Sequence, residues 1–259
     1  MLTCQPLLKK VNIMERLMMS NRLFLLFVLA MGWLFFHPMA AQAEVWVVAA
    51  GISDYPGTVN DLRLPAKDAE TIAQLYKRNC NAHAQLLLDD EATATNIVAT
   101  MRTQYAKAKE DDIVVFFFSG HGSREGCFCA YDGYLEYEDV RDAMALSKSK
   151  NKMIFADACF AGKMRQDGHA MKPTDLNVML FLSSRSDETS IERPSMKNGF
   201  FTACLDRCLR GAADVNKDRT ITAKELFTAV QRGVVKLSKD KQHPVMWGNF
   251  DDDMPVMVW

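Results

Sequence analysis

The sequence predicts an α/β fold, with one domain built on a mostly parallel central sheet and helices on both of its faces. Strand-like and helix-like segments alternate from residue 44 onward, as they do when helices connect parallel strands. Most of the strand-like segments are apolar throughout, which is typical of strands covered on both faces. No internal repeat or low-complexity linker divides the 259 residues, of which 49% are hydrophobic, so we expect a single core.

In the first half of this domain, Val45–Ala50 is an apolar run that ends at a glycine, as a buried strand before a turn should. A helical pattern begins at Pro65, because proline is favoured in the first turn of a helix. Ile113–Phe118 is apolar at every position and should be the central strand. A second strand and a second helix are expected between them, at Ala84–Leu88 and Ala92–Ala106.

The second half continues the alternation after a short excursion at Cys127–Tyr131. Apolar runs and helical spacing predict the remaining elements. The expected helices are Glu138–Leu146, Gly199–Leu209 and Ala223–Val235. The expected strands are Met153–Ala156, Val178–Leu182 and, at the end of the chain, Pro244–Trp247.

Residues 1–43 are expected to be a signal peptide, cleaved before Glu44. Lysines and arginines precede the apolar run Leu23–Phe36, and Ala41-Gln42-Ala43 has the small-x-small pattern of a cleavage site. The run is shorter than the roughly 20 residues that a spanning helix needs. We therefore expect a periplasmic or secreted protein with no stable membrane association after cleavage; an uncleaved anchor is the alternative. The net charge of -1 gives no reason to expect a nucleic-acid partner.

The expected mature chain contains six cysteines: Cys80, Cys127, Cys129, Cys159, Cys204 and Cys208. An oxidising compartment permits disulfides, but the sequence cannot choose a pairing. A zinc site of two cysteine pairs is disfavoured, because the second pair lies one helical turn apart and lacks a knuckle loop. Reduced buried thiols or one disulfide fit the pattern better.

Two residues suited to catalysis follow consecutive buried strands. His121 lies in Ser-Gly-His-Gly after one apolar run, and Cys159 lies in Asp-Ala-Cys-Phe-Ala-Gly after another. Active sites of open α/β sheets gather at the carboxyl ends of strands, so the two side chains could face one substrate. A cysteine beside a histidine can act as a nucleophile, with backbone N–H groups of Gly122 and Cys159 as oxyanion donors. Taken singly, each could instead be a buried thiol or a turn residue.

These motifs resemble those of the caspase–metacaspase family, and the resemblance covers nearly all of the chain after residue 43. Val47–Tyr55 is similar to the family's first strand and turn, and Gln242–Gly248 to a late block. The resemblance implies a cysteine endopeptidase with a Cys159–His121 dyad, peptide or protein substrates, and no metal or organic cofactor for the chemistry. Cys-Phe-Ala-Gly stands where metacaspases typically have Cys-His-Ser-Gly, which blurs the branch of the family.

The resemblance also implies a pocket for the substrate side chain before the scissile bond. Asp157, Asp68 and Ser119 match positions similar to the metacaspase S1 pocket. Two carboxylates and a hydroxyl would favour arginine or lysine there. Caspases proper cleave after aspartate and use arginines instead; Arg63 and Arg193 lie within about a residue of those positions, so an Asp-specific peptidase is an alternative.

The loop 214–225 resembles the calcium-binding loop of an EF-hand. Oxygen-bearing side chains occupy its ligand positions, although Arg219 stands where the sharp turn prefers glycine. The candidate ligands are Asp214, Asn216, Asp218, Thr220 and Glu225. A structural turn that begins the following helix is the alternative to a calcium site.

Two rival functions remain open on the sequence. One is a catalytically silent module of the same fold that only binds a partner, although both dyad residues are present. The other is a thiol hydrolase of small esters or amides.

Overall fold

The computed structural model describes residues 43–123, 126–159, 178–185 and 196–258. The chain divides into two units, Met1–Gln42 and Ala43–Trp259, and every described residue belongs to the second. Apart from Ala43, the expected signal peptide lies outside the described residues, and its cleavage stays a prediction. No helix in the described part of the chain is long and apolar enough to cross a membrane.

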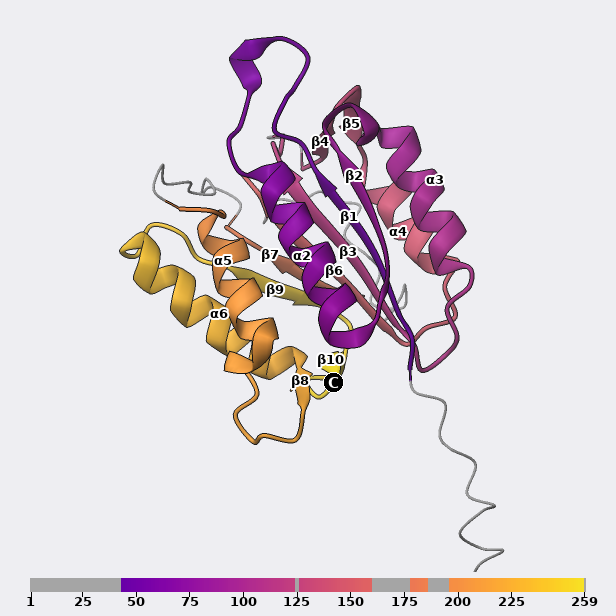
Figure 1. The fold of residues 1–259 in the computed structure, drawn as a ribbon, viewed down its shortest axis with the longest axis vertical. Helices are drawn as coiled ribbons and strands as arrows, with labels where there is room; N and C mark the ends of the chain where they lie inside the picture. The colour runs from indigo at the N-terminus through magenta and orange to yellow at the C-terminus, as the bar shows by residue number, and fades with distance from the viewer. Residues whose placement is uncertain (1–42, 124–125, 160–177, 186–195, 259) are drawn as a thin grey trace, which may run out of the picture. The chain divides into compact units, whose positions relative to one another are not determined.

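A six-stranded sheet forms the centre of the second unit, in the order β2-β1-β3-β6-β7-β9 (Figure 1). Its strands pair in parallel except for β9, which runs antiparallel to β7. The bounds are β1 (Val45–Gly51), β2 (His83–Leu88), β3 (Ile113–Gly120), β6 (Asn151–Ala158), β7 (Val178–Leu182) and β9 (Val245–Gly248). The predicted α/β fold with a mostly parallel sheet is confirmed.

Helices cover both faces of this sheet. On one face lie α2 (Pro65–Cys80), α5 (Phe200–Arg207) and α6 (Ala223–Ser238), and on the other α3 (Ala94–Tyr105) and α4 (Tyr137–Ala145). Alternate residues of β3 show why the run is apolar throughout. Phe117 belongs to the first core and Phe116 and Phe118 to the second, and all three are fully buried. The side chains on each face of β3 therefore have a layer of helices to pack against.

Capping residues set the helix starts. The sequence places a helix start at Ala92, but α3 begins at Ala94, because the hydroxyl of Thr93 accepts a hydrogen bond from Asn96 N at 3.1 Å and caps the helix. At the start of α6, Thr222 and Glu225 form a capping box with reciprocal side-chain-to-backbone bonds.

Shorter elements were less visible in the sequence. A hairpin of β4 (Phe128–Ala130) and β5 (Gly133–Leu135) follows β3, and β8 (Thr220–Thr222) pairs with β10 (Pro255–Val258) beside α6 (Figure 1). The helix expected to reach Leu209 ends at Arg207 and continues as a π-helical turn, Cys208–Ala212. In the described part of the chain, the other short helices are η1 (Thr58–Asn60) and η2 (Asp89–Glu91).

Candidate active site

His121 and Cys159 lie directly after two adjacent strands. β3 and β6 pair in parallel register, with Ser119 opposite Asp157 and Gly120 opposite Ala158. The histidine and the cysteine are therefore the next residues of the two strands, at the same edge of the sheet. The two strands are neighbours in the sheet, and the spacing of adjacent strands, about 4.8 Å, places the two backbones side by side.

Gly122 lies against the backbone of Cys159. A Cβ added at Gly122 would collide with the carbonyl oxygen of Cys159, so only glycine permits this approach. Gly122 also forms an isolated bridge with Phe128, whose flanking hydrogen bonds use His121 O and Ser123 N. Gly122, one predicted oxyanion donor, thus lies directly beside Cys159, which is both the other predicted donor and the expected nucleophile.

The imidazole of His121 is held by the loop between β1 and α2. Its Nε2 lies 2.8 Å from the carbonyl oxygen of Asn60. A carbonyl oxygen only accepts hydrogen bonds, so Nε2 carries the proton in this arrangement and Nδ1 is the basic nitrogen. The ring also packs against Tyr55, with centroids 4.9 Å apart and planes tilted by 45°.

Two buried carboxylates lie near the end of the same strands. Asp68, in the first turn of α2, is 1% exposed, and Asp157, in β6, is 5% exposed. Asp68 accepts hydrogen bonds from Ser119 Oγ at 3.1 Å and from Asn198 Nδ2 at 2.8 Å. Asp157 accepts from Thr202, through Oγ1 at 2.8 Å and through the backbone N–H at 3.2 Å.

Gly199 lies between these two carboxylates. A Cβ there would lie 2.7 Å from Asp157 Oδ2 and 3.4 Å from Asp68 Oδ2. Both acids therefore come close to one point. Burial, and then the charge of Asp157, raise the pKa of Asp68 well above its usual range.

One small pocket brings the predicted site residues together. Its volume is about 70 Å³. It is lined by Leu62, Pro65, Asp68, Ser119, Gly120, His121, Asp157, Cys159 and Gly199. The two residues of the expected dyad and the three expected specificity residues thus line one depression, with the two carboxylates buried at its wall. Arg193 lies outside the described residues; Arg63 is within them, between Leu62 and the start of α2.

Several other thiols are held in their protonated form. Burial raises the pKa of Cys204 to about 12 and that of Cys208 to about 11. Burial, followed by a hydrogen bond to Glu136, raises the pKa of Cys127 to about 12. Thiols with such pKa values are weak nucleophiles at neutral pH. Cys127, Cys204 and Cys208 are unbridged, and in the described part of the chain no three His, Cys, Asp or Glu side chains gather as a metal site.

The loop 214–225 is tied together by its own hydrogen bonds. Glu225 accepts from the N–H of Thr222 at 3.1 Å and of Val215 at 3.4 Å, and Asp214 Oδ2 accepts from Arg219 N at 3.2 Å. Arg219 takes the left-handed conformation, with φ at 67°, at the position where an EF-hand loop has glycine. Asp214 Oδ1 is buried without a hydrogen-bond partner among the described residues.

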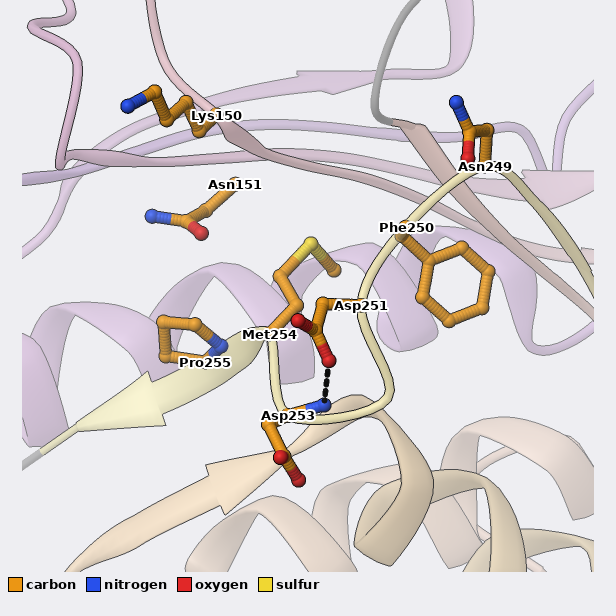
Figure 2. A pocket seen from close by; sticks show the side chains of 8 residues that line it. All are labelled: Lys150, Asn151, Asn249, Phe250, Asp251, Asp253, Met254 and Pro255. Carbon is orange, nitrogen blue, oxygen red and sulfur yellow. Dashed lines mark hydrogen bonds between the residues drawn. The ribbon is translucent and has the colours of Figure 1, made fainter. Parts of the chain in front are cut away.

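A second, larger hollow lies at the opposite edge of the sheet, where β6 begins (Figure 2). Its volume is about 560 Å³. The lining residues are Lys150, Asn151, Asn249, Phe250, Asp251, Asp253, Met254 and Pro255. None of the described residues that line it is a cysteine, serine or histidine, so it offers no counterpart to the dyad.

Fold and site together define an α/β protein that carries a thiol and an imidazole at the carboxyl edge of two adjacent parallel strands. A family model described as Caspase domain matches residues 45–254. The chain belongs to this family, and membership suggests a cysteine peptidase that acts on proteins.

Among solved structures, the chain is similar to the crystal structure of protein GSU0716 from Geobacter sulfurreducens. The TM-score is 0.62 and the sequence identity 15%, over 81% of this chain and 95% of that one. At this identity the likeness shows the fold alone. No curated protein sequence matches the chain.

Sequence reasoning missed four contributors to the site: Tyr55, Asn60, Gly199 and Thr202. Asn60 acts through its backbone carbonyl, so its residue type carried no signal. Gly199 matters because it has no side chain, but nothing in the sequence placed it between the two carboxylates. Tyr55 was visible in the segment that resembles the family's first strand and turn, but nothing in one sequence linked it to His121.

Proposed function

We propose that this protein is a cysteine endopeptidase that cleaves peptide bonds after arginine or lysine, with Cys159 as nucleophile and His121 as its acid–base partner. One observation supports it most strongly. The parallel register of β3 and β6 sets His121 and Cys159 at matching strand ends, in a pocket that Asp68, Ser119 and Asp157 also line.

The chemistry follows from the groups present. His121 Nδ1 takes the proton of the Cys159 thiol, because Nε2 is held by Asn60 O. The thiolate attacks the scissile carbonyl carbon and forms a C–S bond, and the resulting oxyanion accepts hydrogen bonds from the N–H groups of Gly122 and Cys159. The imidazolium then protonates the leaving amine as the C–N bond breaks. Water hydrolyses the thioester that remains.

A panel of fluorogenic peptides tests this activity. Cys159→Ala should abolish turnover, and His121→Ala should lower kcat by about 10²- to 10⁴-fold. Cys127→Ala is the matched control, because its thiol bonds to Glu136 outside the pocket and its removal should leave turnover unchanged. Hydrolysis that survives Cys159→Ala would overturn the assignment.

The rival functions separate in the same assay. A silent binding module would turn over no substrate even as wild type. A thiol hydrolase of small molecules would cleave esters or simple amides through Cys159 and leave peptides intact.

The acidic wall of the pocket supports the proposed preference for a basic side chain. Asp68 and Asp157 are both buried and both within contact of Gly199, so a guanidinium or ammonium group would relieve their mutual repulsion. Asp157→Ala should erase the preference for Arg or Lys over Asp at the residue before the cleaved bond. A wild-type preference for Asp would favour the alternative that uses Arg63 and Arg193.

We also propose that the protein is exported. The support is the sequence of residues 1–43. Intact-mass measurement of protein recovered outside the cytoplasm should show a chain that begins at Glu44. Recovery from the membrane fraction with Leu23–Phe36 still attached would replace export in soluble form with anchoring.

A further inference from the structure

Tyr55 makes two contacts with His121 and one with Cys129, which is itself hydrogen-bonded to His121. It is 7% exposed and lies in the loop between β1 and α2. Its hydroxyl accepts a hydrogen bond from His121 N at 2.9 Å and donates one to Cys129 O at 3.0 Å. Its ring packs on the imidazole, with centroids 4.9 Å apart.

These hydrogen bonds close a ring through the strand end. Cys129 N donates to His121 O at 2.9 Å, while Tyr55 joins His121 N to Cys129 O. The backbone of His121 is thereby fixed on both sides, by the phenol and by the start of the β4–β5 hairpin. Burial raises the pKa of the Tyr55 phenol, so the hydroxyl keeps its proton and its donor role over the pH range of a peptidase.

The glycine before His121 is needed for this contact. A Cβ at Gly120 would lie 2.6 Å from the Tyr55 hydroxyl oxygen, closer than real Cβ atoms approach. The loop that carries Tyr55 is in turn anchored, since Tyr55 N donates to Asp61 Oδ1 at 3.3 Å and Leu62 N to Ser53 O at 2.8 Å. The same loop supplies Asn60 O to the imidazole. One loop, tied by its own hydrogen bonds, therefore holds both the backbone and the ring of His121.

We infer that Tyr55 is a positioning residue for His121, which sets the imidazole at the distance and angle that proton exchange with Cys159 requires. This inference rests on the proposed role of His121 as the acid–base partner. Small displacements of a catalytic group lower the rate of the chemical step strongly while leaving substrate binding almost unchanged.

Tyr55→Phe tests it, because phenylalanine keeps the ring contact and removes only the hydroxyl. We expect kcat to fall by roughly 10- to 100-fold with KM nearly unchanged. Tyr105→Phe is the matched control: its buried hydroxyl donates to Val115 O at 2.7 Å, on the face of the sheet packed by α3. It should lose a similar amount of stability and keep wild-type kcat.

The pH dependence of Cys159 alkylation gives a readout independent of peptide turnover. Iodoacetamide labelling, followed on the Cys159 peptide by mass spectrometry, should show a higher pH midpoint in Tyr55→Phe than in wild type, because a displaced imidazolium stabilises the thiolate less. Tyr105→Phe should keep the wild-type midpoint. If wild type hydrolyses no peptide, the proposed activity fails, while the alkylation midpoints still decide the role of Tyr55.

Gly120→Ala approaches the same contact from the other side and covers the case in which Tyr55→Phe folds poorly. Alanine should displace the hydroxyl and lower kcat in the wild-type background. In the Tyr55→Phe background its effect should be smaller, since the oxygen that it meets is gone. Unchanged kcat and alkylation midpoint in Tyr55→Phe, or equal losses of kcat in Tyr55→Phe and Tyr105→Phe, would overturn the inference.

Discussion

Buried acids lie at both edges of the central sheet. At the amino edge, Asp112 is 4% exposed and accepts hydrogen bonds from Glu44 N at 2.9 Å, Lys109 N at 2.7 Å and Trp46 Nε1 at 3.3 Å. At the carboxyl edge, Asp68 also has three donors, from Ser119, Asn198 and Gly199. Only Asp68, however, lies beside a second buried carboxylate, that of Asp157.

The comparison teaches that hydrogen bonding alone does not mark a functional acid. The donors around Asp112 join the starts of β1 and β3, which is a structural role. The pair at the carboxyl edge lies in the pocket that also holds His121 and Cys159, which is why we propose that this pair binds a cationic substrate group. Size does not mark the site either, because the hollow at the amino edge is the larger of the two.

Among the tests of this contrast between the two edges, the largest effect is expected from the same Asp→Asn change made at each edge. Asp157→Asn should lower kcat/KM for Arg and Lys substrates by at least about tenfold, because it removes the buried charge that would pair with the substrate. The Thr202 hydrogen bonds should survive, since the amide oxygen can accept both. Kinetics on peptides that differ only in the residue before the cleaved bond measure the change.

Asp112→Asn should behave in the opposite way. It places an amide N–H₂ group among donors, and we expect a loss of about 1–3 kcal/mol of stability with unchanged specificity. Urea denaturation measures the stability of this variant, and the same peptide kinetics measure its specificity. A shift of specificity on Asp112→Asn would break the contrast between the two edges.

A second prediction uses the raised pKa of Asp68. The folded state keeps this carboxyl protonated to a higher pH than the unfolded state does, so stability should fall as pH rises from about 4 through the raised pKa. Asp68→Asn removes that dependence. The variant should match wild type at low pH and exceed its stability at neutral pH.

Melting temperatures of both proteins between pH 4 and 8 measure this difference. Asp112→Asn is the destabilised control. It keeps Asp68, so its stability should still fall as the pH rises, unlike that of Asp68→Asn. Parallel curves for wild type and Asp68→Asn would mean that Asp68 ionises normally in the fold.

The smallest expected effect concerns calcium and the loop 214–225. Glu225 is already bonded to Thr222 and Val215, so we expect millimolar Ca²⁺ to leave the melting temperature unchanged. Glu225→Gln can keep the capping box and is the matched variant. A calcium-dependent rise in wild type that Glu225→Gln abolishes would instead assign a calcium site, with Asp214 Oδ1 as its first candidate ligand.

The sequence was most informative where a pattern of residues has a single physical explanation. A strand such as Ile113–Phe118 is apolar at every position only when both faces of the sheet are covered, so the sheet and its central strand could be predicted. The positions of His121 and Cys159 followed, because strand ends gather at one edge. The role of each in catalysis remains a proposal.

Other parts depended on contacts between distant segments. β8 and β10 are three and four residues long, and Pro255–Val258 becomes a strand through pairing with Thr220–Thr222. Asn60 and Gly199 contribute to the site through backbone groups, which bond to His121 and to Asp68. Such roles arise from the folded arrangement, so local sequence patterns do not contain them.

The dispersed origin of the pocket has a consequence for how the chain matures. Its walls come from the turn near Leu62, the start of α2, the ends of β3 and β6, and Gly199. Contacts between such distant segments form late, because the intervening loops must close before parallel strands can pair. Gly199 lies between the carboxylates of Asp68 and Asp157, so the complete wall of this pocket forms only after the chain has been made beyond residue 199.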